Sequence, residues 1–141
     1  IDLGLEPYLV SSSLVLVIAQ RLVRTLCPSC RTWKVPDAEH VGSLKAVGVE
    51  VSMLKDGKMA IAPGCEECFH SGYQGRTAIY EMLPMTDVMR ELVMRSASAT
   101  ELKRASIAAG MRTLRQDGML KVVEGVTSPE EVMRVTQLDL V

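Results

Sequence analysis

Four cysteines arranged in two Cys-x-x-Cys pairs constrain this chain more than any other feature of its sequence. They are Cys27 with Cys30 and Cys65 with Cys68, and no thiol is left over. Two residues between the cysteines of a pair let both sulfurs converge on one ion, and two pairs complete the tetrahedral shell of a structural zinc ion. The spacing therefore predicts a four-thiolate Zn2+ site that stabilises its surroundings and leaves no open position for catalysis.

Two other interpretations account for four cysteines in some chains: two disulfides, or four unrelated buried thiols. A secreted disulfide scaffold of this size is normally richer in cysteine and follows a signal peptide, whereas this chain has no basic segment at its start. We therefore favour zinc. The stretch 31–64 is longer than the spacing of an ordinary zinc ribbon, so we expect it to form a small subdomain. His70 follows the second pair closely, but four cysteines already complete the shell and we assign it no metal role.

The composition excludes several classes of protein. With 141 residues and 48% hydrophobic content, the chain can build one or two compact units with a real core. A net charge of −1 and a pI near 6.2 argue against a protein that coats nucleic acid with basic residues. The longest apolar run, residues 14–19, is too short to span a bilayer, so we expect no transmembrane segment.

The first part of the sequence predicts one long helix over residues 7–24, with Pro7 in its first turn. Its apolar residues nearly encircle it as far as Gln20, and such a helix needs more neighbouring protein than this chain supplies. Together with the missing initiator methionine, this indicates a fragment of a longer protein. Arg21 and Arg24 would share one face of the helix near its end.

Basic residues near the cysteines have an expected electrostatic role. Four thiolates around Zn2+ carry a formal charge of −2, which nearby cations would offset. Arg24, Arg31 and Lys34 are the basic residues close enough in sequence to do so. We therefore expect these three residues to have this structural role.

Capping and turn residues predict the other elements. Pro36 opens a helix that Gly48 ends, and residues 58–62 and 76–84 are expected to form strands. Four helices should follow, because the later sequence holds three helix-start residues and two glycine stops. These five positions are Thr86, Ser98, Gly110, Gly125 and Ser128. The predicted fold class is mainly α with a few short strands, ending in a small helical bundle.

No catalytic motif is visible in the chain. It contains no phosphate-binding loop of the Gly-x-x-x-x-Gly-Lys-Ser/Thr type, no Gly-x-Gly-x-x-Gly and no His-Glu-x-x-His. His40 and His70 are the only histidines, and the carboxylates are scattered. We therefore expect no active site within this chain alone.

Several strings of residues, in one order along nearly the whole chain, resemble a single family. They are LEPYLVSSSL (5–14), AQRLVR (19–24), GCEEC (64–68), SGYQGRTAIYE (71–81), GMRTLRQDG (110–118) and GVTSPEEV (125–132). The family is that of the type II secretion system assembly ATPases, the E proteins of the general secretory pathway, within the larger group of secretion and type IV pilus ATPases. One such string would be weak evidence, but the ordered set is specific.

The resemblance implies a division of the chain into three parts. Residues 1–26 would be the end of a RecA-like α/β motor domain, residues 27–75 a tetracysteine zinc subdomain, and residues 76–141 a return strand with a C-terminal helical domain. In the family the phosphate-binding loop and the acidic and histidine boxes precede the matched region. ATP and Mg2+ would therefore belong to the full-length protein, and this fragment alone is expected to be inactive.

The resemblance also implies a setting and two further residues. The full-length protein would be a cytoplasmic homo-hexamer, peripheral to the inner membrane, docked on secretion-platform proteins and driving pseudopilus assembly. Arg76 matches the arginine of the family motif Gly-Tyr-x-Gly-Arg, and Arg21 is a second candidate for a position near bound nucleotide. A guanidinium stays charged and can meet phosphate oxygens, although a structural salt bridge is the alternative for either residue.

Other functions stay open at this point. Type IV pilus assembly ATPases also carry two cysteine pairs, so the pairs alone do not separate the two branches; the Ser-Ser-Ser run and Gly-Arg-Thr-Ala-Ile-Tyr-Glu favour secretion. Pilus retraction ATPases lack the cysteine segment and are disfavoured. From a different class, a zinc-ribbon module that binds nucleic acid or another protein would use the same cysteines, but basic residues interleaved with aromatic ones are missing.

Overall fold

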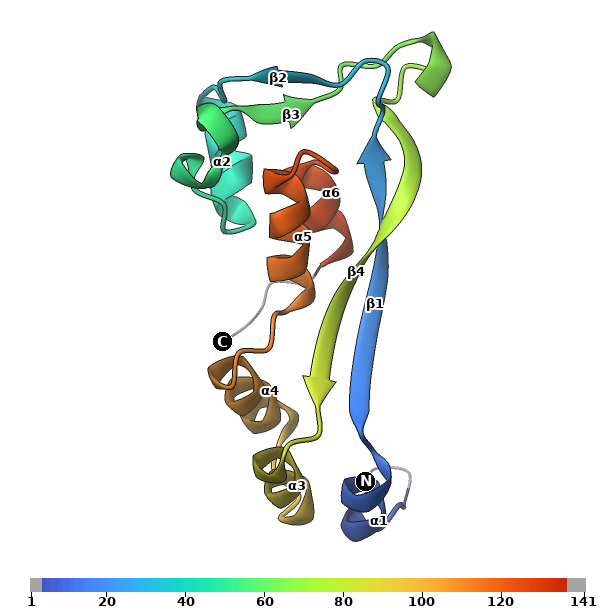
Figure 1. The fold of residues 1–141 in the computed structure, drawn as a ribbon, viewed down its shortest axis with the longest axis vertical. Helices are drawn as coiled ribbons and strands as arrows, with labels where there is room; N and C mark the ends of the chain where they lie inside the picture. The colour runs from blue at the N-terminus through green and yellow to red at the C-terminus, as the bar shows by residue number, and fades with distance from the viewer. Residues whose placement is uncertain (1–3, 137–141) are drawn as a thin grey trace. The chain divides into compact units, whose positions relative to one another are not determined.

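The computed structural model describes residues 4–136 of the chain. This part of the chain forms two compact units: residues 4–19 with Tyr80–Thr113, and Gln20–Ile79 with residues 114–136. Strand β1 (Leu16–Leu26) pairs with β4 (Tyr73–Pro84) in a two-stranded sheet, and the two run in opposite directions (Figure 1). Both strands belong partly to each unit. Among residues 4–136, no helix has the length and apolarity that a bilayer crossing requires.

The prediction of one long helix over residues 7–24 is correct for the first two turns and wrong for the rest. Helix α1 (Pro7–Ser13) begins at the predicted proline, but Leu14 is extended and β1 follows. The segment has the β-branched residues that favour strands, and pairing with β4 supplies the backbone hydrogen bonds that a helix would have made locally. Because alternate residues of a strand point to opposite faces, Arg21 and Arg24 do not share a face as predicted.

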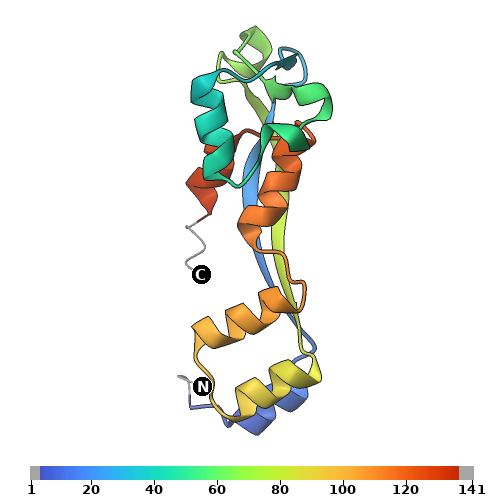
Figure 2. The ribbon, with the colours of Figure 1, turned by 90° about the vertical axis from the view of Figure 1, so that its left-hand side faces the viewer.

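The first unit packs α1 beside α3 (Asp87–Met94), and α3 also contacts α4 (Ala99–Ala108) (Figure 2). The predicted caps are confirmed: Thr86 Oγ1 accepts from the amide of Met89 at 3.4 Å, and Ser98 Oγ accepts from the amide of Glu101 at 3.2 Å. The buried core of this unit consists of Met85, Met89, Leu92 and Val93. Methionine therefore fills half of these positions, as its flexible side chain suits an irregular core.

The second unit combines a small antiparallel sheet with three helices. Strand β2 (Thr32–Lys34) pairs antiparallel with β3 (Met59–Ile61), so that Trp33 lies opposite Ala60. Helix α2 (Ala38–Ala46) lies between these strands in sequence, and α5 (Leu114–Val123) and α6 (Pro129–Val135) complete the unit. Short 3-10 turns cover Val51–Met53, Lys55–Gly57 and Glu66–Cys68. The core is formed by Leu44, Val47, Val49, Leu54, Met59, Val122 and Val132.

Most of the predicted elements in the second unit are confirmed. Asp37 caps α2 through its carboxylate, which accepts from the amide of His40 at 3.0 Å, and the chain leaves α2 through Gly48 with φ 83°. The strand predicted at 58–62 is β3. Strand β2 escaped prediction because three residues are too few to establish a periodic pattern.

The four helices after β4 are divided between the units and do not form the single bundle that the sequence predicts. Helices α3 and α4 belong to the first unit, whereas α5 and α6 belong to the second. Helix α6 begins as expected, with Ser128 Oγ accepting from the amide of Glu131 at 3.3 Å. It packs against α5 at Gly118, where an added Cβ would lie 2.7 Å from the Val132 side chain. Within the described residues, the chain has six α-helices and a few strands.

Candidate metal centre

The two cysteine pairs are brought together by the paired ends of β1 and β4. Cys27 follows the last residue of β1, and its amide donates to the carbonyl of Gly72, just before β4, at 2.9 Å. Cys30 lies one turn further on, while Cys65 and Cys68 enclose a single 3-10 turn. Because one pair ends the first strand and the other precedes its partner strand, strand pairing places all four thiols at one end of the ladder.

The four sulfurs have the spacing of a tetrahedral metal site. Their Sγ atoms all lie within 4.8 Å of one another. The separation is 3.9 Å for Cys27 and Cys65, 4.0 Å for Cys30 and Cys68, and 3.7 Å for Cys65 and Cys68. A Zn–S bond of about 2.3 Å in a tetrahedron sets this S···S distance at about 3.8 Å. The donor set therefore fits a thiolate-bound ion such as Zn2+.

The two alternatives that the sequence leaves open do not fit this arrangement. All four cysteines are free, and the S···S distances are far above the roughly 2.05 Å of a disulfide bond. The thiols are also not scattered through the core, because they converge on one point.

Two glycines allow the second pair to close. Gly64 has φ 103°, and a Cβ there would lie 2.6 Å from the carbonyl oxygen of His70. Gly72 has φ 76°, and a Cβ there would lie 2.3 Å from the carbonyl oxygen of Ala62. Both positions combine a left-handed backbone with close approach of another backbone segment, so a larger residue at either would disturb the cysteine loop.

Backbone amides and burial act in opposite directions on the thiols. The Cys68 sulfur accepts from the amides of Cys65 at 3.2 Å and Gly72 at 3.3 Å, and these donors lower the pKa of Cys68 to about 6. Removal from water, with further contributions from neighbouring sulfurs, raises the pKa of Cys30 to about 12. A cluster of this kind accepts several negative charges together only when a cation is present.

A buried carboxylate anchors the strand that leads into the centre. Glu131 is 1% exposed and accepts from the backbone amide of Arg24 at 2.9 Å and from its guanidinium at 2.9 and 3.1 Å. Arg134 donates to the same carboxylate at 2.7 and 2.9 Å. Hydrogen bonds from Arg134 and then Arg24 outweigh the effect of burial and lower the pKa of Glu131 to about 2. Charge pairing therefore ties β1 to α6.

Further contacts extend this anchor. The Arg24 guanidinium lies 4.1 Å from the centre of the Tyr73 ring, and the Tyr73 hydroxyl is 2.7 Å from Ser128 Oγ. Thr127 Oγ1 donates to the carbonyl of Arg24 at 2.7 Å. The loop before α6 is thus held against the strand ends that carry the cysteines.

The basic residues expected to offset the metal charge have other partners. Arg24 pairs with Glu131, Lys34 Nζ lies 3.3 Å from Asp37, and Arg31 donates to the backbone carbonyl of Gly125 at 3.0 Å. The sequence predicts no electrostatic role for Glu131. No local signal could reveal its role, because its partner Arg24 is 107 residues away in sequence.

Arg21 and Arg76 lie on β1 and β4 and are both exposed. Within residues 4–136, neither makes a side-chain hydrogen bond or an ion pair, so no salt bridge accounts for them. Their position near nucleotide stays a prediction.

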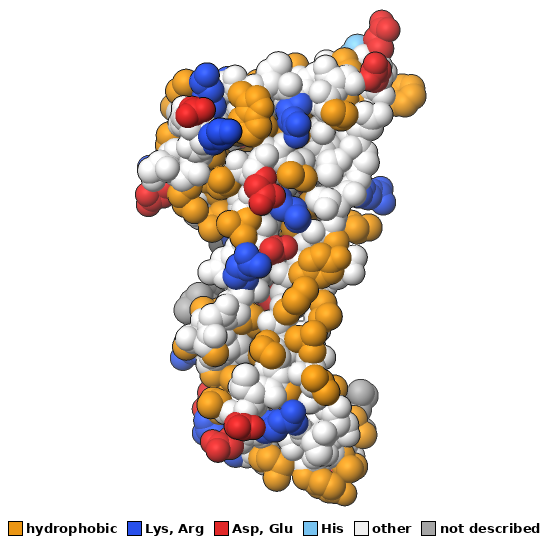
Figure 3. Space-filling model, viewed as in Figure 1, with side chains coloured by type: hydrophobic (Ala, Val, Ile, Leu, Met, Phe, Trp, Pro, Cys, Tyr) orange, Lys and Arg blue, Asp and Glu red, His pale blue; other side chains and the backbone are white. Residues whose placement is uncertain are grey.

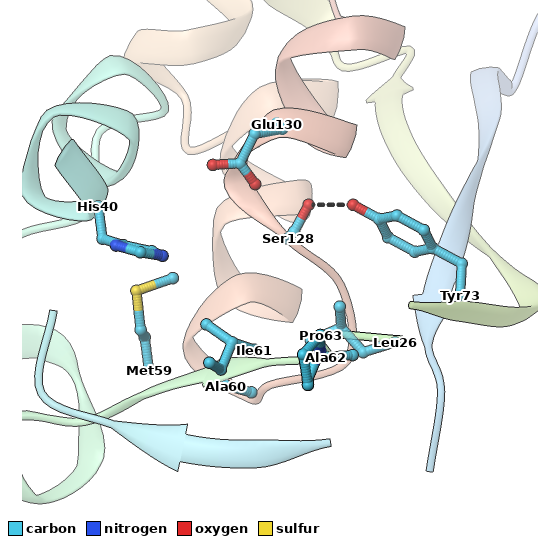
Figure 4. A pocket seen from close by; sticks show the side chains of 10 residues that line it. All are labelled: Leu26, His40, Met59, Ala60, Ile61, Ala62, Pro63, Tyr73, Ser128 and Glu130. Atoms are coloured by element: carbon cyan, nitrogen blue, oxygen red, sulfur yellow. Dashed lines mark hydrogen bonds between the residues drawn. The ribbon is translucent and has the colours of Figure 1, made fainter. Parts of the chain in front are cut away.

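A pocket of about 290 Å3 lies close to the metal centre in the second unit (Figure 4). Strand β3 lines one side, His40 of α2 and Glu130 of α6 lie on others, and Leu26, Pro63 and Tyr73 connect it to the cysteine segments. The Ser128 hydroxyl is engaged by Tyr73 and by the amide of Glu131, so it is not a free nucleophile.

Comparison with known proteins gives consistent matches. A family model described as type II/IV secretion system protein matches residues 1–134. A type IV pilus assembly ATPase PilB from Myxococcus xanthus (strain DK1622) is 42% identical over 141 residues, which cover 99% of this chain and 24% of the relative. Type II secretion system protein E from Dickeya dadantii (strain 3937) is 46% identical over 138 residues, covering 96% of this chain and 26% of the relative.

A third relative gives the same result. Type II secretion system ATPase E from Vibrio cholerae serotype O1 is 43% identical over 136 residues, covering 96% of this chain and 26% of the relative. The chain therefore spans about a quarter of the length of each of these three curated relatives.

Proposed function

Because the chain belongs to the type II/IV secretion system protein family, we propose that it is the C-terminal part of a cytoplasmic hexameric ATPase that powers type II protein secretion. In this proposal the phosphate-binding loop that holds ATP and Mg2+ lies outside residues 1–141. The full-length protein docks on secretion-platform proteins at the inner membrane and drives pseudopilus assembly. The relatives named as type II secretion proteins support this branch of the family.

The observation that carries the proposal for this part of the protein is the convergence of four thiols within 4.8 Å. We propose that Cys27, Cys30, Cys65 and Cys68 hold one structural Zn2+. Four protein ligands leave no position for water or substrate, so the ion would stabilise the fold and supply no reaction chemistry. Its role would be to join two segments that are more than thirty residues apart in the chain.

We further propose the three-part division at residues 1–26, 27–75 and 76–141. The exposed apolar surface of β1 supports the assignment of residues 1–26 to the end of a RecA-like motor domain. Val15 just before the strand is 75% exposed, and Ile18 and Leu22 within it are 53% and 49% exposed. Such a surface is normally covered by further protein, which the remaining three quarters of a full-length relative would supply.

Arg21 and Arg76 are the residues that we propose to lie near bound nucleotide. Support comes from their exposure and from the absence of an ion-pair partner within the described residues. A free, exposed guanidinium is available to phosphate oxygens contributed from outside this chain.

Type IV pilus assembly is the second candidate function. It is favoured by one observation, the relative named PilB that aligns with 99% of this chain. A complementation assay separates the two. The full-length protein should restore secretion of folded proteins to a host that lacks its secretion ATPase, and should not restore pili to a host that lacks its pilus assembly ATPase. Restoration of pili alone would select the second candidate.

A second experiment tests whether ATP hydrolysis requires the part of the protein outside this chain. ATP hydrolysis is compared between the full-length protein and the isolated 141-residue chain. We expect hydrolysis only from the full-length protein, because this chain has no phosphate-binding loop. Hydrolysis by the isolated chain at the rate of the full-length protein would contradict the proposal.

A further inference from the structure

A glutamine side chain reaches the metal centre from the start of β4. The carboxamide of Gln74 lies 3.7 Å from Cys27 Sγ, within the distance of a hydrogen bond to sulfur. Because Cys27 has no exposed surface, its sulfur depends on protein groups for its hydrogen bonds. Gln74 itself is exposed, so core packing does not account for its side chain.

Strand pairing fixes the position of Gln74. Its neighbour Tyr73 points toward the loop before α6 (Figure 4), and Gln74 points to the opposite face because successive residues of a strand alternate. The backbone carbonyl of Gln74 accepts a hydrogen bond from Thr25 Oγ1. The amide of Cys27 donates to the carbonyl of Gly72 at 2.9 Å. These bonds between the two strand ends keep the Gln74 side chain beside Cys27.

A carboxamide suits both protonation states of the Cys27 sulfur. It carries an oxygen that accepts and an NH2 group that donates, and rotation by 180° exchanges the two. The oxygen accepts from Cys27 when this residue is a thiol. A thiolate bound to a metal ion has no proton and only accepts, so the NH2 group would then face the sulfur.

The surroundings of the cysteines give a neutral donor a particular value. Arg24 pairs with Glu131, and Arg31 donates to a backbone carbonyl in the turn after α5. Glu66 and Glu67, inside the second cysteine pair, add negative charge, and acidic side chains are visible beside this loop in the upper right of Figure 3. Four thiolates around Zn2+ keep a formal charge of −2, which N–H dipoles aimed at sulfur stabilise.

We propose that Gln74 is a positioning residue of the metal centre, whose carboxamide N–H donates to the Cys27 thiolate and strengthens the binding of zinc. The inference rests on the proposed zinc centre and adds a supporting residue to it. Cys68 accepts in a comparable way from the amides of Cys65 and Gly72. With Gln74, each cysteine pair therefore has a sulfur that accepts from an N–H group.

Three variants of the full-length protein isolate the donor. The backbone bond of Gln74 does not use its carboxamide, so substitutions can remove the donor alone. Gln74→Glu keeps the shape but replaces the donor by a negative charge, and Gln74→Leu removes the donor without adding charge. Gln20→Glu is the matched control, because Gln20 is exposed in the same unit and lies in β1 away from the cysteine end.

Zinc affinity, measured by competition with a chelator, is the first readout. We expect Gln74→Leu to weaken zinc binding about tenfold and Gln74→Glu up to about 100-fold, the range for groups that support a metal ligand. Gln20→Glu should stay within about twofold of the wild type, as a surface substitution away from the site. Wild-type affinity in both Gln74 variants would overturn the proposal. Weakening by Gln74→Glu alone would also overturn it, because charge repulsion would then be the whole effect.

Absorption of the Co2+-loaded full-length protein separates a hydrogen bond to sulfur from an effect on the fold. Donation to a thiolate lowers the energy of the sulfur electrons, so loss of the donor should move the sulfur-to-cobalt charge-transfer band to lower energy in both Gln74 variants. The band of Gln20→Glu should coincide with that of the wild type. A band at the wild-type energy in the Gln74 variants, even with weaker affinity, would give Gln74 a structural role only and overturn the proposal.

The same spectra distinguish this inference from the metal centre on which it rests. If the wild-type protein gives the spectrum of four thiolates and the Gln74 variants leave it unchanged, the centre stands and the role of Gln74 is wrong. If the wild-type protein binds no Co2+ through sulfur, the four-thiolate centre is itself wrong, and the role of Gln74 with it.

Discussion

Glu131 joins strand β1 to helix α6 within the second unit. Its buried carboxylate receives the backbone amide and the guanidinium of Arg24 and the guanidinium of Arg134. Both arginines keep part of their side chains in water, with 43% and 58% exposed, whereas the carboxylate has none. The desolvated partner thus depends on the pairing far more than the arginines do.

Replacing the Glu131 carboxylate should destabilise the folded protein. Glu131→Gln leaves the amide and both guanidinium groups without their charged acceptor, so we expect a loss on the order of 2–4 kcal/mol in the free energy of unfolding. Urea denaturation followed by the fluorescence of Trp33, the only tryptophan, measures it. The exposed neighbour in the same helix provides the control, because Glu130→Gln should change stability by less than about 0.5 kcal/mol. Equal effects of the two substitutions would rule out the anchoring role.

The same carboxylate makes the free energy of unfolding depend on pH. Its pKa is about 2 in the folded chain, below the ordinary value of 4.5, so its contribution is fully present above about pH 4.5 and is lost as pH falls through 2. Stability measured from pH 5 to pH 2 should therefore fall less steeply in Glu131→Gln than in the wild type. Parallel curves for the two proteins would show that another group causes the acid dependence.

Residue-scale prediction from sequence succeeds where the signal is local and fails where it is not. The four cysteines are recognisable because Cys-x-x-Cys spacing is itself the geometric requirement. The pairing of Arg24 with Glu131 links opposite ends of the chain, and no spacing rule could reveal it.

Among the helices and strands, capping residues are more informative than hydrophobic pattern. Thr86, Ser98 and Ser128 each begin a helix where the sequence predicts one, because a cap satisfies amides within three residues of itself. The apolar run that continues into β1 has a pattern that also suits a helix, so local sequence does not settle its conformation. That conformation depends on pairing with β4, some sixty residues later.

Close packing at Gly125 gives a prediction for the turn after α5. This glycine, which ends that turn, has φ 71°, and an added Cβ would lie 2.4 Å from the Trp33 ring. Gly125→Ala should therefore cost about 2–4 kcal/mol of unfolding free energy, from overpacking added to backbone strain. Gly110→Ala is the control, because Gly110 has φ 95° but no atom within 4 Å of the added Cβ, and should cost only about 1–2 kcal/mol. A similar loss of unfolding free energy in both variants would mean that the Trp33 ring can move away from the added methyl group.

Across the whole molecule, the two compact units are expected to respond differently to metal removal. All four thiols belong to the second unit, whereas α3 and α4 have a separate methionine-rich core in the first. The sequence predicts the cysteine site and most elements, but not this partition, because it arises from contacts between distant segments.

Hydrogen exchange tests this difference. Chelation, or Cys65→Ser, should remove protection from the amides around both cysteine pairs, because only these segments need the ion to stay closed. The amides of Asp87–Met94 and Ala99–Ala108 should keep their protection. Loss of protection throughout the chain would show that the two units unfold as one.

The proposed role of this chain depends above all on four thiolates that hold one zinc ion at the paired ends of β1 and β4. Zinc X-ray absorption on the full-length protein, purified without chelator and with its metal content measured, examines this centre itself. We predict one equivalent of zinc with four sulfur neighbours at about 2.3 Å. Less than about half an equivalent, or a shell containing nitrogen or oxygen, would contradict the four-thiolate centre.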